Sequence, residues 1–395
     1  MREFVVSEYG MVPDAAYDQT EQFQKILDLC KEEGGKVVIP AGTYRMSSVR
    51  MWSDTEIYLQ KGARLEGSSD CNEYKMFELP EGLELFTDQQ AFARPYYFFH
   101  TEEGPYPFYR RAMISAYGEK NLTIVGEEGS VIDGMDCYDP EGEENFRGPH
   151  GIFFSSCSDI RLQGYTICNT GNFMHQLDNC TDVVLERITA LAGHDGIHLH
   201  MCKDMKIVDC YFHTGDDCIA GCDVQDLTVT GCDLNTSCNV FRLGGRDILI
   251  ENNKIEGPGE YPHRLSLVGQ GIFEFEKSDG RHNTISLFEY FASKNFANRE
   301  PARDIVIRNC AVTGVDSLMH YEHDKADCLH AGMDLEEIVF ENVTVEELLH
   351  PSYVVGSEEL PVKIKLKNVT FSYRDSQTYP LFDAKNVILE ENSPA

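Results

Sequence analysis

The stretch C-S-D-I-R-L-Q-G-Y-T-I at residues 157–167 decides the fold, because close copies of it follow along the chain. The best copies span 180–190, 202–212, 224–234 and 245–255, and their shared aspartates are 23, 22, 22 and 21 residues apart. Each copy holds an alternating β-branched strand, a polar turn and a second short strand. A period of about 20–25 residues built from short strands is typical of a parallel β-helix. The sequence therefore predicts an all-β solenoid.

Weaker copies extend the repeat toward both ends of the chain. They lie at 119–132, 302–312, 335–345, 362–371 and 384–392. The leucine framework of leucine-rich repeats is missing, although the period is similar. We therefore expect a single parallel β-helix domain over residues 1–395.

The first turn of the solenoid differs from the others. Residues 18–33 read as an amphipathic helix, with Phe23, Ile26, Leu27 and Cys30 on one face and Gly34-Gly35 as a stop. A solenoid needs a cap over its open end, so this helix is the expected cap. The segments 36–44 and 55–67 then begin the coils.

Two insertions break the period, at 71–111 and 256–301. Insertions in a solenoid emerge as loops and often wall a binding groove. The first is rich in aromatic residues, which suit the apolar faces of sugar rings. The alternative is that these loops pack onto the solenoid body.

Composition excludes some partners. The 395 residues hold 34 Lys+Arg against 66 Asp+Glu, a net charge of −32. This charge argues against nucleic acid as a partner. It also argues against a strongly anionic polymer as the substrate unless a local basic pocket exists. The alternative is that the acidity only keeps the protein dispersed in solution. No apolar run approaches the ~18 residues of a membrane span. The start, MREFVVSEYG, is no signal peptide, so we expect a cytoplasmic protein, or a secreted one if a signal has been removed.

The 14 cysteines fit a reduced core better than a metal site. Cys157, Cys180 and Cys202 follow the repeat period, as small apolar residues stacked in a ladder would. The spacing C-I-A-G-C at 218–222 is not C-x-x-C, and no partner pair follows. We expect no metal and no cofactor.

Aligned by the period, polar residues form columns. One column runs Asn172, Asp195, Asp217, Asn239; the next runs Gly171, His194, Asp216, Cys238; a third runs His175, His198, Ala220, Arg242. Asp195 and Asp217 would stack about 5 Å apart by strand spacing, with Asp216 beside them. Like charges this close do not all ionise, so one carboxyl should hold a proton beside a general base.

Two other interpretations of these acids stay open. An Asn/Asp turn ladder would use them only for hydrogen bonds between coils. A calcium site would serve a lyase, with Arg242 as its base. Three acids with His194, His198, His213 and Arg242 nearby favour catalysis.

At these residues the chain resembles glycoside hydrolase family 28, the polygalacturonase family of right-handed parallel β-helices. The resemblance covers roughly 5–255, through the segments 9–44, 116–134 and 147–173, and more weakly the rest. G-H-D ending at Asp195 stands for the family's N-T-D, and Asp216, Asp217 and Cys218 match its D-D-C. The resemblance implies an inverting glycosidase, in which Asp216 is the general acid and Asp195 and Asp217 activate water.

The chain also departs from the family. S-C-N at 237–239 replaces G-H-G, and the R-I-K that grips a galacturonate carboxylate has no match in 284–300. These losses favour a substrate other than plain polygalacturonate, such as a neutral oligo- or polysaccharide. The expected substrate-binding residues are His194, His198, Arg242, Asn172, Asn239, His175 and, as a substitute acid, Glu289.

A hydrolase is therefore the predicted function. The alternatives are a β-helix lyase, epimerase or fructan-type transglycosylase, and a glycan-binding solenoid without catalysis. We expect a polysaccharide partner, no nucleic acid and no membrane; the sequence does not set the oligomeric state.

Overall fold

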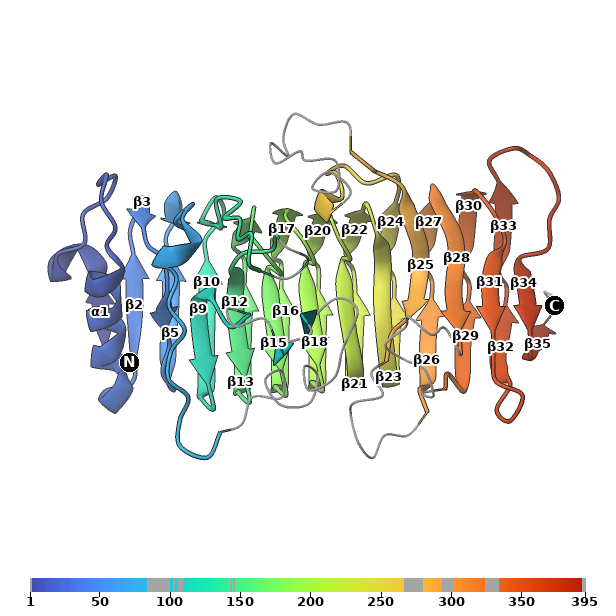
Figure 1. Ribbon diagram of the computed structural model, residues 1–395, viewed down its shortest axis with the longest axis horizontal. Coiled ribbons are helices and arrows are strands. Elements are labelled where there is room, and N and C mark those ends of the chain that lie inside the picture. Colours follow the sequence, from blue (N-terminus) through green and yellow to red (C-terminus); the bar gives the residue numbers. More distant parts are fainter. Residues whose placement is uncertain are drawn as a thin grey trace. The chain divides into compact units, whose positions relative to one another are not determined.

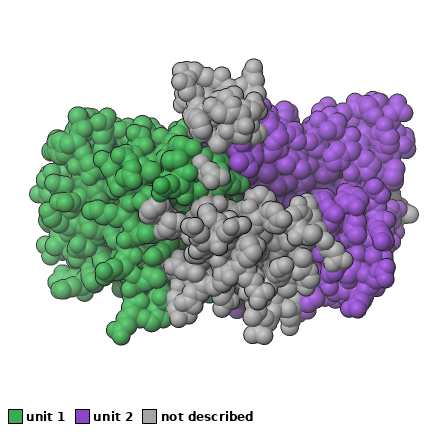
Figure 2. Space-filling view, in the orientation of Figure 1, with its two compact units in different colours: residues 1–198 green, residues 199–395 purple. Residues whose placement is uncertain are grey.

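The computed structural model describes residues 2–83, 100–101, 104–105, 109–142, 144, 146–265, 280–292, 301–323 and 334–392. The chain divides into two compact units, Met1–His198 and Leu199–Ala395 (Figure 2). Short parallel strands dominate each unit and fall into three rows (Figure 1). This confirms the predicted right-handed parallel β-helix. The single-domain boundary at 1–395 stays a prediction.

In the first unit, each coil after β1 contributes a repeat-row and a short-row strand, and each of these coils but the last contributes a lead-row strand. The repeat row holds β1 (Glu3–Val5), β2 (Gly35–Ile39), β5 (Thr55–Leu59), β10 (Lys120–Gly126), β13 (Ser158–Gln163) and β16 (Thr181–Glu186). The short row holds β3 (Gly42–Arg45), β6 (Ala63–Glu66), β11 (Val131–Asp133), β14 (Thr166–Cys168) and β17 (Thr189–Ala192). The lead row holds β4 (Val49–Arg50), β9 (Ala112–Tyr117), β12 (His150–Ser155) and β15 (His175–Asp178).

The second unit repeats this plan. Its repeat row holds β19 (Lys203–Val208), β21 (Ile219–Thr230), β23 (Asn239–Glu251), β26 (Arg303–Arg308), β29 (Glu337–Glu341), β32 (Val362–Lys367) and β35 (Val387–Asn392). Its short row holds β20 (Tyr211–Thr214), β22 (Asp233–Thr236), β24 (Lys254–Glu256), β27 (Ala311–Thr313), β30 (Thr344–Leu348) and β33 (Thr370–Tyr373). The first halves of β21 and β23 begin its lead row, which continues through β25 (Thr284–Tyr290), β28 (Val315–Glu322), β31 (Ser352–Val355) and β34 (Phe382–Lys385). One strand, β18 (Ile197–His200), lies at the boundary of the units.

The repeat aspartate has a backbone role. The residues concerned, Asp159, Asp182, Asp204, Asp226 and Asp247, all have a φ between 52° and 56°. Asp tolerates this left-handed region better than most residues with a side chain. The chain therefore turns into each repeat strand at the aspartate. Beyond it, alternate side chains are buried, and Ile160 and Leu162 of β13 lie in register with Val183 and Leu185 of β16.

The predicted cap is helix α1 (Thr20–Glu33), which lies against β2 (Figure 1). Its buried face is Phe23, Ile26, Leu27 and Cys30, as predicted. The helix begins two residues later than expected, because the side chain of Asp18 accepts hydrogen bonds from the Thr20 N–H and hydroxyl. It ends at Gly34, whose φ is 67° and whose N–H donates to the Cys30 carbonyl.

The two predicted insertions are described only in part. The first contains the 3-10 turn η2 (Cys71–Glu73) and the hairpin of β7 (His100–Thr101) and β8 (Gly104–Pro105). Residues 84–99 and most of its aromatics lie outside the described residues, as do 266–279 and 293–300 of the second. Tyr109 is buried against His150, as expected for a loop packed on the solenoid body. That the two insertions form the walls of a binding groove stays a prediction.

Two smaller predictions concern cysteines and membranes. Every cysteine that the structure describes is free, and most are buried, Cys157, Cys180 and Cys202 among them. This agrees with the predicted reduced ladder. The helices among the described residues include none with the length and apolarity needed to cross a bilayer.

Candidate active site

The three predicted catalytic aspartates follow short-row strands, where the chain turns toward the lead row. In the first unit, His194 and Asp195 follow β17. In the second unit, Asp216 and Asp217 follow β20.

In the second unit, Asp217 is buried and held in place. Its Oδ1 accepts hydrogen bonds from both the backbone N–H and the Nδ2 of Asn239, each at 2.9 Å. Its Oδ2 lies 3.9 Å from the Nε of Arg242. The Oδ1 of Asn239 in turn accepts from the hydroxyl of Ser286. This orients the amide nitrogen of Asn239 toward Asp217.

The pKa of the Asp217 carboxyl is shifted by these surroundings. Burial and the neighbouring Asp216 raise the pKa of its carboxyl above the usual value, whereas Arg242 and Asn239 oppose the rise. Two interacting carboxyls lose their protons in two steps that belong to the pair. The pair can therefore hold one proton under conditions in which an isolated aspartate would hold none.

Asp216 is placed differently. Its side chain is 12% exposed, against 3% for Asp217. Its backbone carbonyl accepts hydrogen bonds from the hydroxyls of Thr214 and Thr236, and its Oδ1 accepts from the Asp217 N–H. The backbone is thus fixed while one edge of the carboxyl remains accessible. That arrangement suits a proton donor.

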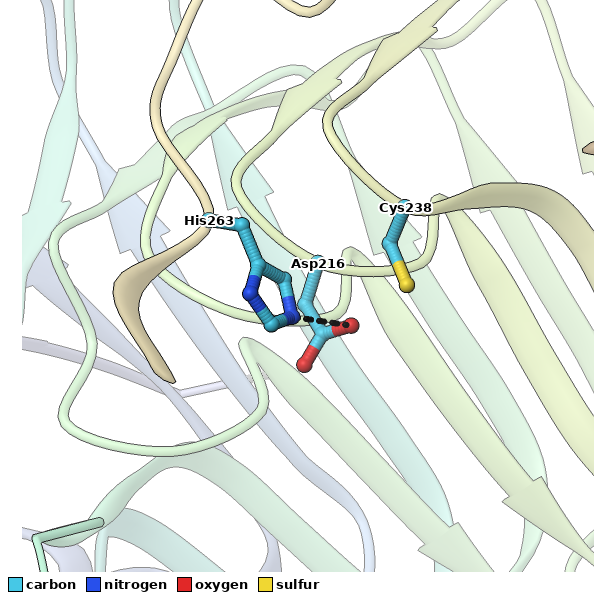
Figure 3. A group of neighbouring side chains, drawn as sticks. All are labelled: Asp216, Cys238 and His263. Atoms are coloured by element: carbon cyan, nitrogen blue, oxygen red, sulfur yellow. Dashed lines mark ion pairs between the residues drawn. The ribbon is translucent and has the colours of Figure 1, made fainter. Parts of the chain in front are cut away.

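His263 and Cys238 lie beside Asp216 (Figure 3). The Nε2 of His263 is 3.7 Å from the Oδ1 of Asp216. Burial and the carboxyls of Asp217 and Asp216 raise the pKa of the Cys238 thiol well above its usual value. The replacement of G-H-G by S-C-N did not point to His263, because this histidine comes from the second insertion and follows no repeat column.

Arg242 and Glu289 lie in register on the neighbouring lead-row strands β23 and β25. The guanidinium of Arg242 lies 4.0 Å from the centre of the Phe291 ring, which fixes its direction. Glu289 pairs with the Nδ1 of His320 at 2.8 Å, and the Nε2 of His320 lies 3.3 Å from Glu322. The predicted substitute acid is therefore hydrogen-bonded to His320, a contact that the sequence did not reveal.

In the first unit, Asp195 is buried beside His198. The Nδ1–H of His198 donates to the Oδ2 of Asp195 at 2.6 Å, and its ring stacks on Phe173 at 4.3 Å. Arg147 lies 5.3 Å from the same Phe173 ring and donates to the Oδ1 of Asn172. His198 thus orients Asp195, a role distinct from the predicted substrate contact.

The prediction that His175 binds substrate is not supported. The side chain is fully buried, and its Nδ1–H donates to the Gly196 carbonyl. Its Nε2 lies 2.9 Å from the hydroxyl of Tyr165. Burial lowers the pKa of His175 to about 4, so we assign it to the core. His194 is also buried, with its ring 5.4 Å from that of Phe146.

The structure thus groups Asp216, Asp217, Asn239 and Arg242 in the second unit, and Asn172, Asp195 and His198 in the first. The vertical stacking of Asp195 with Asp217 relates residues of different units and stays a prediction. Of the residues that sequence reasoning missed, His263 and His320 carried no periodic signal. Cys238 was visible as a departure from G-H-G and in the column of His194 and Asp216, but it was not assigned to the site.

The comparisons place this chain among known proteins. Residues 97–263 match the model of glycosyl hydrolases family 28. This range is less than half of the chain, and over it the chain is similar to that family. A "Probable polygalacturonase" of Vitis vinifera is 25% identical over 236 residues, which cover 54% of this chain and 43% of the relative. The chain therefore spans less than half the length of that relative.

Solved structures show the shared fold. An exopolygalacturonase of Thermotoga maritima superimposes with a TM-score of 0.71 at 15% identity, covering 98% of this chain and 92% of that one. A family 28 exopolygalacturonase of Yersinia enterocolitica gives 0.68 at 17% identity, covering 99% and 78%. The family 28 match includes Asp195, Asp216 and Asp217 and ends at His263, before Glu289.

Proposed function

We propose that this protein is a glycoside hydrolase that cleaves O-glycosidic bonds by carboxylate acid/base catalysis. The observation that carries the proposal is the adjacent pair Asp216 and Asp217, whose side chains are 12% and 3% exposed and have different neighbours. Neighbouring carboxyls in different surroundings take different protonation roles. The family 28 match over 97–263 supports the same chemistry.

Asp216 is the proposed general acid. Its side chain is the more exposed of the pair, which suits proton donation to the oxygen of a leaving sugar. Asp217 is the proposed base. Its hydrogen bonds from Asn239 and its contact with Arg242 favour the ionised form and oppose the rise in pKa that burial and Asp216 cause. Asp195 is proposed as a second water-activating carboxylate; the 22-residue interval to Asp217 and the resemblance to family 28 support this role.

The proposed substrate class is a pectin-type oligo- or polysaccharide. The support is the name of the Vitis vinifera relative, a probable polygalacturonase, and a structural neighbour described as an endo-xylogalacturonan hydrolase. Plain polygalacturonate is the less favoured member of the class, because R-I-K is absent and the net charge is −32. Arg242 is the proposed contact for a polar or anionic sugar substituent.

A glycan panel tests the proposal. Polygalacturonate, xylogalacturonan and neutral oligosaccharides are incubated with the protein, and new reducing ends are measured together with ultraviolet absorbance. A hydrolase yields reducing ends without absorbance. A lyase creates a C=C double bond that absorbs with every cleavage, and a transglycosylase yields longer products without a net gain of ends. Glycan binding without turnover on every substrate would contradict the proposal.

A further inference from the structure

Three different metal-ligand side chains converge in the second unit, and one of them is the proposed acid, Asp216. They are Asp216 before β21, Cys238 before β23, and His263 in the second insertion (Figure 3). One carboxylate oxygen, the thiol sulfur and one ring nitrogen all lie within 4.8 Å of one another. Asp216 and His263 are buried, and Cys238 is partly exposed.

The donor types select a class of metal. Zinc in proteins is bound by Cys sulfur, His nitrogen and carboxylate oxygen, with Zn–S of about 2.3 Å and Zn–N of about 2.0–2.1 Å. Ligand atoms around one such ion lie about 3.3–3.8 Å apart, and the His263 Nε2 is 3.7 Å from the Asp216 Oδ1. Calcium and magnesium prefer oxygen ligands alone. The set therefore fits a divalent transition metal.

The surrounding hydrogen bonds hold the ligands in place. The hydroxyl of Thr236 donates to the Asp216 carbonyl and accepts from the Cys238 N–H. It thus joins the two turns that carry these ligands. The N–H of His263 donates to the carbonyl of Arg281 at 2.9 Å. Fixed backbones reduce the entropy lost when a metal orders its ligands.

We propose that Asp216, Cys238 and His263 form a binding site for zinc or a similar divalent transition metal ion. Three protein ligands leave a fourth position for water, as in open zinc sites. Binding releases the thiol proton, and the metal charge stabilises the thiolate among the acids. No ligand pair follows a short sequence spacing, which is why the sequence predicted no metal.

The site has a consequence that rests on the proposed function. A metal bound to the Asp216 carboxylate occupies the oxygen that would carry the acid proton. Metal binding therefore inhibits hydrolysis, and a chelator restores it. Activity unaffected by one bound equivalent of zinc would contradict this consequence.

Titration with Co²⁺ and Zn²⁺, without substrate, tests the site whether or not a glycan is cleaved. We expect one equivalent of Co²⁺ to give the ultraviolet band of a thiolate–cobalt bond, and Zn²⁺ to displace it. In Cys238→Ser the band disappears, because the thiolate ligand is gone. Zinc affinity falls by more than about tenfold, since changes to residues that only support a ligand already cost about that much. His263→Ala lowers the affinity for zinc to a similar degree.

Matched controls are Cys310→Ser, a buried cysteine of the second unit outside the cluster, and His350→Ala, an exposed histidine. Both should bind zinc as the unchanged protein does. Should Cys238→Ser fail to fold, thiol alkylation of the unchanged protein is mapped with and without zinc, and zinc protects Cys238. Zinc binding with no cobalt–thiolate band, or with Cys238 unprotected, would overturn the proposal.

Discussion

Asp216 and Asp217 are neighbours in the chain, yet their side chains meet different surroundings. Asp217 contacts Asn239 and Arg242, whereas the more exposed Asp216 lies beside His263. Because the roles of paired carboxyls follow their environment, a single residue step separates a proposed base from a proposed acid. The hydroxyl of Thr236 donates to the Asp216 carbonyl and so fixes the backbone that carries the proposed acid.

His175 makes stability depend on pH. Its pKa falls from 6.5 to about 4 because it is buried, so the unfolded chain binds a proton at a higher pH than the folded protein. The contribution of neutral His175 is fully present above pH 6.5 and is lost as pH falls from 6.5 toward 4. The loss amounts to at most about 3 kcal/mol.

Urea unfolding at several pH values checks this. The unchanged protein should lose stability more steeply below pH 6.5 than His175→Gln, which does not titrate there. His350→Gln, a change at an exposed histidine, should keep the full slope. Identical slopes for His175→Gln and the unchanged protein would show that burial of His175 does not govern this pH dependence.

At the scale of the element, a ladder of asparagines joins the coils of the second unit. Asn342 donates to the Oδ1 of Asn309 and accepts from the Nδ2 of Asn368. Each of these residues has a φ of 53°, at the turn between the repeat-row and short-row strands. The ladder therefore satisfies two needs together, a left-handed turn and a hydrogen bond between coils.

Replacing Asn342 separates these two needs. Asn342→Ala should lower the free energy of unfolding by about 1–3 kcal/mol, because it loses the amide bonds and strains the left-handed turn. Asn342→Gly loses only the bonds and relieves the strain, so its loss should be smaller. Urea unfolding of both variants measures the difference. An equal loss in the two would contradict the role given to the turn.

The elements were predictable to different degrees. The strand copies and the face of α1 follow from alternation and helical spacing, which local sequence carries. The helix begins at Thr20 and not at the predicted residue 18, because the Asp18 side chain accepts a hydrogen bond from the Thr20 N–H. His263 was invisible because it reaches Asp216 from an insertion, so only tertiary packing brings it there. His175 shares a column with Arg242 but points into the core, and column position alone does not show that.

At the scale of the whole molecule, the net charge of −32 should shape substrate choice. A polyanion is repelled at low ionic strength, and salt screens that repulsion over a Debye length of about 10 Å at 0.1 M. We expect kcat/KM on polygalacturonate to rise with salt, while kcat/KM on a neutral oligosaccharide stays flat. Measuring both substrates across a salt series checks this. A fall on polygalacturonate would show that local basic residues dominate.

The glycosidase assignment rests on Asp216, and one substitution tests it most directly. Asp216→Asn keeps the shape of the side chain but removes the acid proton. The matched control is Asp226→Asn, at an exposed repeat turn whose φ of 52° asparagine also tolerates. On the best substrate of the glycan panel, reducing-end release should fall about 10²–10⁴-fold in Asp216→Asn, while its free energy of unfolding stays unchanged. In Asp226→Asn, reducing-end release should persist. Full activity in a folded Asp216→Asn protein would contradict the account.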